Sequence, residues 1–174
     1  MVLRVFGIKV IIEFSFVLML AFALLAGANN LLYVLLFASL HETGHIFILY
    51  LLKGKADEVK LSYYGIGLKH SFEMSRGREA VFLLGGCAVN ALFCVLNIKR
   101  DINLPLLIMN ILPVYPLDGG RLLKLFTGIH IKVFLCISSV VLISLLTISI
   151  YYNNLNLLLI TVYLAVFSYN EEMK

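Results

Sequence analysis

The sequence predicts an all-α integral membrane protein with about six transmembrane helices and a small β-hairpin between the second and third helices. Of its 174 residues, 61% are hydrophobic and only 14% are charged. A soluble domain of this size cannot bury so much apolar surface, because a small domain keeps much of its surface in water. Apolar runs also recur along the chain at about the 20-residue length that crosses a bilayer. We therefore expect a single transmembrane domain over residues 1–174.

The apolar runs follow one another with short polar connections. The first run covers about residues 10–28 and could instead be a signal peptide, because small residues near its end resemble a cleavage site. The length of the run and Glu13 near its start favour a retained helix. The prolines of the chain fall in the fourth run, so we expect that span to be irregular. The remaining runs cover about residues 31–52, 79–98, 102–116, 132–150 and 155–167.

A polar stretch separates the second and third runs. Its segment ADEVKLSYYGIGLKHSF alternates apolar and polar residues on both sides of Gly65 and Gly67. This alternation around glycines predicts a β-hairpin. Two interpretations of the hairpin stay open: an ordinary surface hairpin, or an exposed strand edge that holds an unwound substrate by strand addition.

The distribution of the basic residues predicts the orientation in the membrane. If the N-terminus is cytoplasmic, all of the 14 Lys and Arg residues except Lys99 and Arg100 fall on the cytoplasmic side. The positive-inside rule therefore places both termini in the cytoplasm of a multi-pass protein. Scattered basic residues do not form the stripe that nucleic-acid binding requires, so we expect no nucleic-acid partner. The three cysteines form no CxxC, which argues against a disulfide framework or a cysteine zinc site.

The segment HETGH, in the second apolar run, carries the clearest chemistry. Titratable side chains are costly in a membrane helix and usually mark a functional site there. His41 and His45 are four residues apart, so their imidazoles lie on one face of a helix and can bind one zinc ion. Glu42 lies beside them, where it can take a proton from water at the metal.

Two histidines leave a catalytic zinc short of one protein ligand, because such sites usually have three. Asp118 is the candidate, since it follows Pro113 and Pro116 and precedes two glycines in NILPVYPLDGGRLLK. Irregular backbone of this kind is tolerated at membrane depth where it lines a cavity. The alternative is that Asp118 caps the helix that begins after it. Spacing alone does not decide between the two.

HETGH followed by NILPVYPLDGGR resembles the site-2 protease family of intramembrane zinc metalloproteases, which pairs HExxH with a later NxxPxxPxDGG segment. The resemblance covers nearly the whole chain. It implies His41, His45 and Asp118 as ligands of one Zn²⁺ per chain, and Glu42 as the catalytic acid/base. It also implies a membrane-tethered protein substrate, and a regulatory membrane protein as a further partner.

Within that family, NILPVYPLDGGRLLK is similar to the stage IV sporulation protein FB type. The resemblance implies a protein of the bacterial cytoplasmic membrane that acts in sporulation on a sigma-factor precursor. Members of this branch commonly carry a CBS domain after the last helix. We expect neither a CBS nor a PDZ domain within residues 1–174.

Other polar residues have two open interpretations. Gly86 and Asn90 lie one helical turn apart in LLGGCAVNALF, which resembles a glycine-rich element of the same family. Asn90, Asn110 and Gly86 are candidates for binding the substrate backbone or an oxyanion. The alternative is a small-residue packing face on which Asn90 joins two helices. His70 and His130 have no partner at ligand spacing and are expected to be interfacial.

The sequence thus predicts an intramembrane zinc metalloendopeptidase. One alternative is an inactive zinc-binding membrane chaperone or adaptor of the same fold, although binding alone would not need Glu42. A metal transporter is the other alternative. It would need further intramembrane carboxylates or histidines along a path, and the fourth to sixth runs offer none beyond Asp118.

Overall fold

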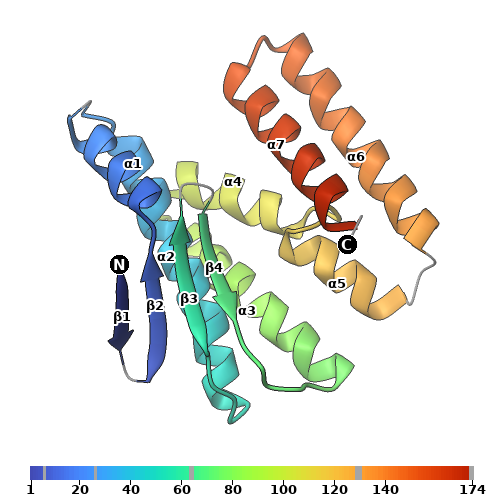
Figure 1. Cartoon of the computed structure of the whole chain (residues 1–174). Coiled ribbons are helices and arrows are strands. Elements are labelled where there is room, and N and C mark those ends of the chain that lie inside the picture. The colour runs from blue at the N-terminus through green and yellow to red at the C-terminus, as the bar shows by residue number, and fades with distance from the viewer. Residues whose placement is uncertain (6, 26, 63–64, 128–130, 173–174) are drawn as a thin grey trace. The chain divides into compact units, whose positions relative to one another are not determined.

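The computed structural model describes residues 1–174 except 6, 26, 63–64, 128–130 and 173–174 (Figure 1). The chain forms two compact units, Met1–Leu107 and Ile108–Lys174, and each is described by itself. The boundary falls within helix α4 (Arg100–Ile111). A single domain over residues 1–174 stays a prediction.

The first unit contains a four-stranded sheet, whose strands lie side by side in Figure 1. Its order is β1-β2-β3-β4, so β1 and β4 are the two edges. Strands β3 and β4 pair antiparallel between the second and third helices, which confirms the predicted hairpin. Strand β2 joins this hairpin in parallel to β3 and pairs antiparallel with β1. The strands are β1 (Val2–Val5), β2 (Ile8–Ile12), β3 (Glu58–Ser62) and β4 (Gly65–Lys69).

The N-terminal segment differs from the prediction of one helix from about residue 10. Residues as far as Ile12 belong to β2, and helix α1 is Phe14–Leu25. Strand β2 has the sequence IKVII, and β-branched side chains favour a pleated sheet. Its pairing with β3 also brings Nζ of Lys9 within 3.2 Å of a carboxylate oxygen of Glu58. The 12 residues of α1 rise only about 18 Å, too short for a bilayer core of about 30 Å.

Helices α2 (Asn29–Leu51) and α3 (Arg76–Val95) pack closely against each other. A Cβ atom added to Gly44 of α2 would lie 2.5 Å from the carbonyl oxygen of Gly85 on α3. A Cβ atom added to Gly85 would lie 2.8 Å from the carbonyl oxygen of Gly44. The rings of Phe37 and Phe93 meet edge to face, with centroids 5.2 Å apart. Only a pair of glycines lets the two backbones approach this closely.

The second unit consists of helices. After α4 the chain turns through the proline-containing segment and enters α5 (Asp118–Thr127), as the prolines and glycines predict. The Oγ atom of Ser138 donates a hydrogen bond of 2.9 Å to the carbonyl oxygen of Pro113, which ties this turn to α6 (Ile131–Tyr151). Helix α6 packs against α7 (Leu155–Glu172) after a turn at Asn153, whose φ is +48°.

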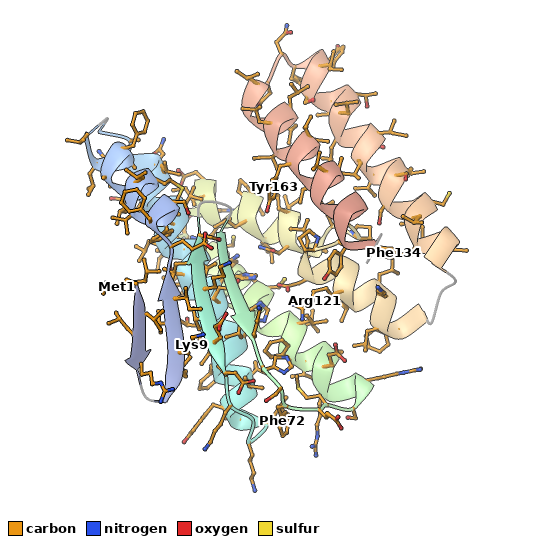
Figure 2. All side chains as sticks on the ribbon, viewed as in Figure 1. Met1, Lys9, Phe72, Arg121, Phe134 and Tyr163 are labelled. Atoms are coloured by element: carbon orange, nitrogen blue, oxygen red, sulfur yellow. The ribbon has the colours of Figure 1, made fainter. Side chains whose placement is uncertain are left out.

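Three helices of the described chain are long and apolar enough to cross a membrane. They are α2, α3 and residues Val133–Tyr151 of α6. The apolar parts of α1 and α7 are shorter, and α4 has 12 residues with Pro105 inside. Figure 2 shows large side chains projecting along α6 and α7, where Ile143, Ile150 and Val166 are exposed. These long apolar helices and exposed faces suit lipid contact, and six spans remain a prediction.

Candidate metal centre

The two histidines of HETGH lie on one face of α2, as their spacing predicts. Their Nε2 atoms are 3.2 Å apart, and both side chains are buried, with exposed fractions of 5% for His41 and 3% for His45. Two nitrogens bound to a tetrahedral zinc ion at about 2.0–2.1 Å would be about 3.3 Å apart. The two imidazole nitrogens are therefore already separated as one such ion requires.

Glu42 completes a group of three potential ligands. The potential ligand atoms of His41, Glu42 and His45 all lie within 4.8 Å of one another. Glu42 is half-buried, and its carboxylate lies close to both imidazoles. This arrangement leaves Glu42 within reach of a water molecule beside the histidines.

The backbone of α3 fixes the ring of His45. The Nδ1 atom of His45 lies 2.8 Å from the carbonyl oxygen of Phe82. A carbonyl oxygen only accepts hydrogen bonds, so Nδ1 carries the proton and donates it. The Nε2 atom of a neutral His45 then keeps its lone pair, which is the form that binds a metal. The Phe82 contact could not be predicted from the sequence, because any residue type can supply a carbonyl.

Gly86 leaves the space in front of the two rings open. A Cβ atom at this position would lie 2.5 Å from Nε2 of both His41 and His45. No other residue type could occupy this position without moving the rings. The space, the nitrogen separation and the carboxylate fit a zinc site formed by imidazole and carboxylate ligands. The structure places Gly86 against the Nε2 atoms of both imidazoles, and its predicted role in substrate binding stays a prediction.

Asn90 lies one turn beyond Gly86 and is fully buried, with an exposed fraction of 0%. Its Nδ2 atom is 3.1 Å from Nδ1 of His41, so its amide joins α3 to α2. This contact is the interhelical link that the sequence allowed as one interpretation. Binding of a substrate or oxyanion by Asn90 stays a prediction.

The other candidate residues belong to the second unit. Asp118 is the first residue of α5 and is buried. Nη1 of Arg121, which Figure 2 labels on α5, lies 4.0 Å from its Oδ1 atom. Gly119 packs against the preceding turn, because a Cβ atom there would lie 2.0 Å from the carbonyl oxygen of Ile111. Asn110 lies near the end of α4. The roles of Asp118 as a zinc ligand and of Asn110 in substrate binding stay predictions.

A series of ring contacts connects the hairpin to the candidate metal centre. The ring of Phe82 lies between His45 and His70, with centroid distances of 5.2 and 4.8 Å. His70 directly follows β4, and its Nδ1 atom is buried with no hydrogen-bond partner among the residues described. The sequence predicted an interfacial role for His70 and gave no sign of this contact. His130 lies outside the described residues.

Glu13, just before α1, pairs with the sheet. Nζ of Lys60 on β3 lies 2.8 Å from Oε1 of Glu13. The hydrogen bond from Lys60 lowers the pKa of the Glu13 carboxyl below its ordinary value, and Ser15 contributes in the same direction. Glu13 therefore stays charged and links the start of α1 to the sheet.

Comparison with known proteins supports the fold. No protein-family model matches the sequence, and no curated protein matches it. Among solved structures, the fold is similar to the Site-2 Protease from Methanocaldococcus jannaschii, with a TM-score of 0.67. The match covers 100% of this chain and 95% of that one, at 18% sequence identity. The chain therefore has a fold of the site-2 protease type, with a candidate His–Glu–His metal site on its second helix.

Proposed function

We propose that this protein is an intramembrane zinc metalloendopeptidase of the site-2 protease type. One observation carries the proposal: His41 and His45, buried in an apolar helix, hold their Nε2 atoms 3.2 Å apart beside Glu42. Buried ionisable groups in an apolar helix are costly unless they serve a function. The similarity of the fold to that of a site-2 protease supports the proposal independently.

Each residue of the site has a role in this proposal. His41, His45 and Asp118 hold one zinc ion, with Asp118 assigned from the NxxPxxPxDGG pattern. Zinc bound there would supply Lewis acidity, which polarises a peptide carbonyl and makes water ionise near neutral pH. Glu42 accepts the proton of the attacking water and returns it to the leaving amine, so it acts first as a base and then as an acid.

We propose that the substrate is a membrane-tethered protein and that an extended segment of it pairs with β4. Strand β4 is an edge of the sheet, so its outer backbone groups are available for strand addition. It packs against α2, and His70 at its end contacts Phe82, whose carbonyl oxygen fixes His45. A segment paired with β4 would be held unwound beside the metal centre.

The finer assignments come from the sequence patterns. The similarity of NILPVYPLDGGRLLK to the stage IV sporulation protein FB type supports a sigma-factor precursor as substrate and a regulatory membrane protein as partner. The basic residues support a multi-pass protein of the bacterial cytoplasmic membrane with six spans and cytoplasmic termini. The protein would be a single domain with one zinc per chain.

Zinc content and cleavage test the proposal together. Full-length protein purified in detergent should contain about one zinc per chain, and Asp118→Ala should lose it or bind it far more weakly. Glu42→Gln should retain zinc but fail to cleave a membrane-tethered test substrate carrying the sigma-factor precursor segment. Wild-type protein free of zinc under non-chelating conditions would contradict the proposal, and so would cleavage by Glu42→Gln at the wild-type rate.

A further inference from the structure

We infer that Asn90 is a positioning residue for the metal centre. When an ion is bound, the amide oxygen of Asn90 accepts a hydrogen bond from the Nδ1–H group of His41. This bond directs the lone pair of His41 Nε2 toward the ion. This inference rests on the proposed function, because it takes His41 and His45 as metal ligands. It assigns Asn90 a role that differs from binding of substrate or oxyanion.

The surroundings of Asn90 provide the first observation. The side chain is completely buried, and its amide nitrogen lies 3.1 Å from Nδ1 of His41. Its amide oxygen is also buried and has no hydrogen-bond partner among the residues that the structure describes. A buried acceptor without a partner is unfavourable, so the observed orientation has no advantage in pairing over the rotated one, in which the oxygen is paired and the nitrogen is not.

The hydrogen-bonding chemistry of the amide and the two imidazoles provides the second step of the argument. An amide nitrogen can only donate, so in the observed orientation Nδ1 of His41 accepts and its proton is on Nε2. That Nε2–H can donate to Nε2 of His45, 3.2 Å away, because His45 carries its own proton on Nδ1. The two rings therefore satisfy each other. A protonated Nε2, however, has no lone pair for a metal, so ligation by His41 requires its proton to be on Nδ1.

A rotation of the Asn90 amide by half a turn supplies a hydrogen-bond acceptor for His41 with its proton on Nδ1. The rotation exchanges the two ends of the amide, so the oxygen takes the position 3.1 Å from Nδ1 that the nitrogen holds now. The oxygen then accepts the Nδ1–H bond, and the nitrogen takes the position of the oxygen. Amide oxygen and nitrogen are nearly equal in size, so no other atom has to move.

One face of α3 can offer each of the two histidines an oxygen that accepts its Nδ1–H group. Phe82, Gly86 and Asn90 follow one another at intervals of four residues, on one face of the helix. The carbonyl oxygen of Phe82 accepts from His45, and Asn90 faces His41 in the corresponding position. Metal-binding histidines usually donate their second N–H group to an oxygen, which fixes the tautomer and the ring orientation.

Zinc affinity of the full-length protein in detergent tests the inference. Asn90→Leu keeps the size of the side chain and removes both hydrogen-bonding groups, so it should weaken zinc binding by about 10–100-fold. Asn90→Asp presents only acceptors and should stay near the wild-type affinity. Asn103→Leu is a matched control. Asn103 is also fully buried, and its amide oxygen has no hydrogen-bond partner in the described part of the chain, but its amide nitrogen donates to the carbonyls of Ile98 and Lys99. It should leave zinc affinity unchanged.

A spectroscopic measurement separates positioning from a structural role. The chain has four histidines, so ¹⁵N labelling of histidine alone gives a simple spectrum. In the zinc-loaded wild type, Nδ1 of His41 should be protonated, which supports the inference even if Asn90→Leu does not fold. Protonation on Nε2 would overturn it, as would wild-type affinity in Asn90→Leu or a loss in Asn90→Asp as large as in Asn90→Leu. Wild-type protein that binds no zinc would refute the proposed function as well.

Discussion

Substitution of Gly86 by alanine tests the geometry of the metal centre most directly. The new Cβ atom would lie 2.5 Å from Nε2 of both His41 and His45. Non-bonded atoms of this kind are comfortable at about 3.5 Å or more, so the rings would have to move by about 1 Å. Zinc–ligand distances tolerate deviations of only about 0.2 Å. His45 could move only by weakening its hydrogen bond to the carbonyl oxygen of Phe82.

We therefore expect Gly86→Ala to weaken zinc binding at least about 100-fold, which is about 2.8 kcal/mol. The assay is competition against a chelator of known affinity, with the protein in detergent. Gly77→Ala, on the same helix, is the control, because a Cβ atom there meets nothing within 4 Å. Circular dichroism of both variants shows whether the helices are intact. Zinc affinity near the wild-type value in a folded Gly86→Ala protein would refute the assigned geometry.

Three further predictions concern catalysis, helix packing and the ion pair of the sheet. Glu42→Gln should retain about one zinc per chain and lower the rate of peptide hydrolysis by about 10²–10⁴-fold; an unchanged rate would exclude Glu42 as the proton carrier. Gly85→Ala places a Cβ atom 2.8 Å from the carbonyl oxygen of Gly44. It should lower the free energy of unfolding by about 1–3 kcal/mol, measured by denaturant titration. Unchanged stability would show that α2 and α3 can separate at no cost. Lys60 lowers the pKa of Glu13, so the ion pair stabilises the fold above the ordinary pKa of the carboxyl and is lost as the pH falls through the lowered value. An NMR titration should therefore give Glu13 a lower midpoint in the wild type than in Lys60→Met, and equal midpoints would contradict the pairing.

Local sequence patterns predicted the parts of the fold that depend on neighbours along the chain. The spacing of His41 and His45 placed both rings on one face, because a helix turn brings residues four apart together. Pro113 and Pro116 predicted that α4 ends before the turn that leads to Asp118, because proline rarely continues a helix, whereas Pro105 lies inside α4. The alternation on both sides of Gly65 and Gly67 predicted two paired strands, although both glycines lie within β4.

The N-terminal strands could not be predicted in the same way. The apolar run from residue 10 continues past Glu13 into α1, and periodicity does not distinguish a strand from a helix in so short an apolar segment. What makes Ile8–Ile12 a strand is its pairing with β3, more than 40 residues later in the chain. The contact of the Phe82 carbonyl oxygen with His45 could not be predicted either, because every residue type has a backbone carbonyl.

The short sequence between Phe82 and Asn90 now has a consistent physical explanation. Gly85 lets α3 approach the backbone of α2, and this close approach brings Phe82 and Asn90 within hydrogen-bond distance of His45 and His41. The same approach would fill the space beside both Nε2 atoms if Gly86 carried a side chain. Close packing of the helices and an open space for an ion therefore require two glycines in succession, because adjacent residues of a helix face different directions. The backbone of α2 accounts for Gly85, and the two imidazoles account for Gly86, because a Cβ atom there would meet both Nε2 atoms.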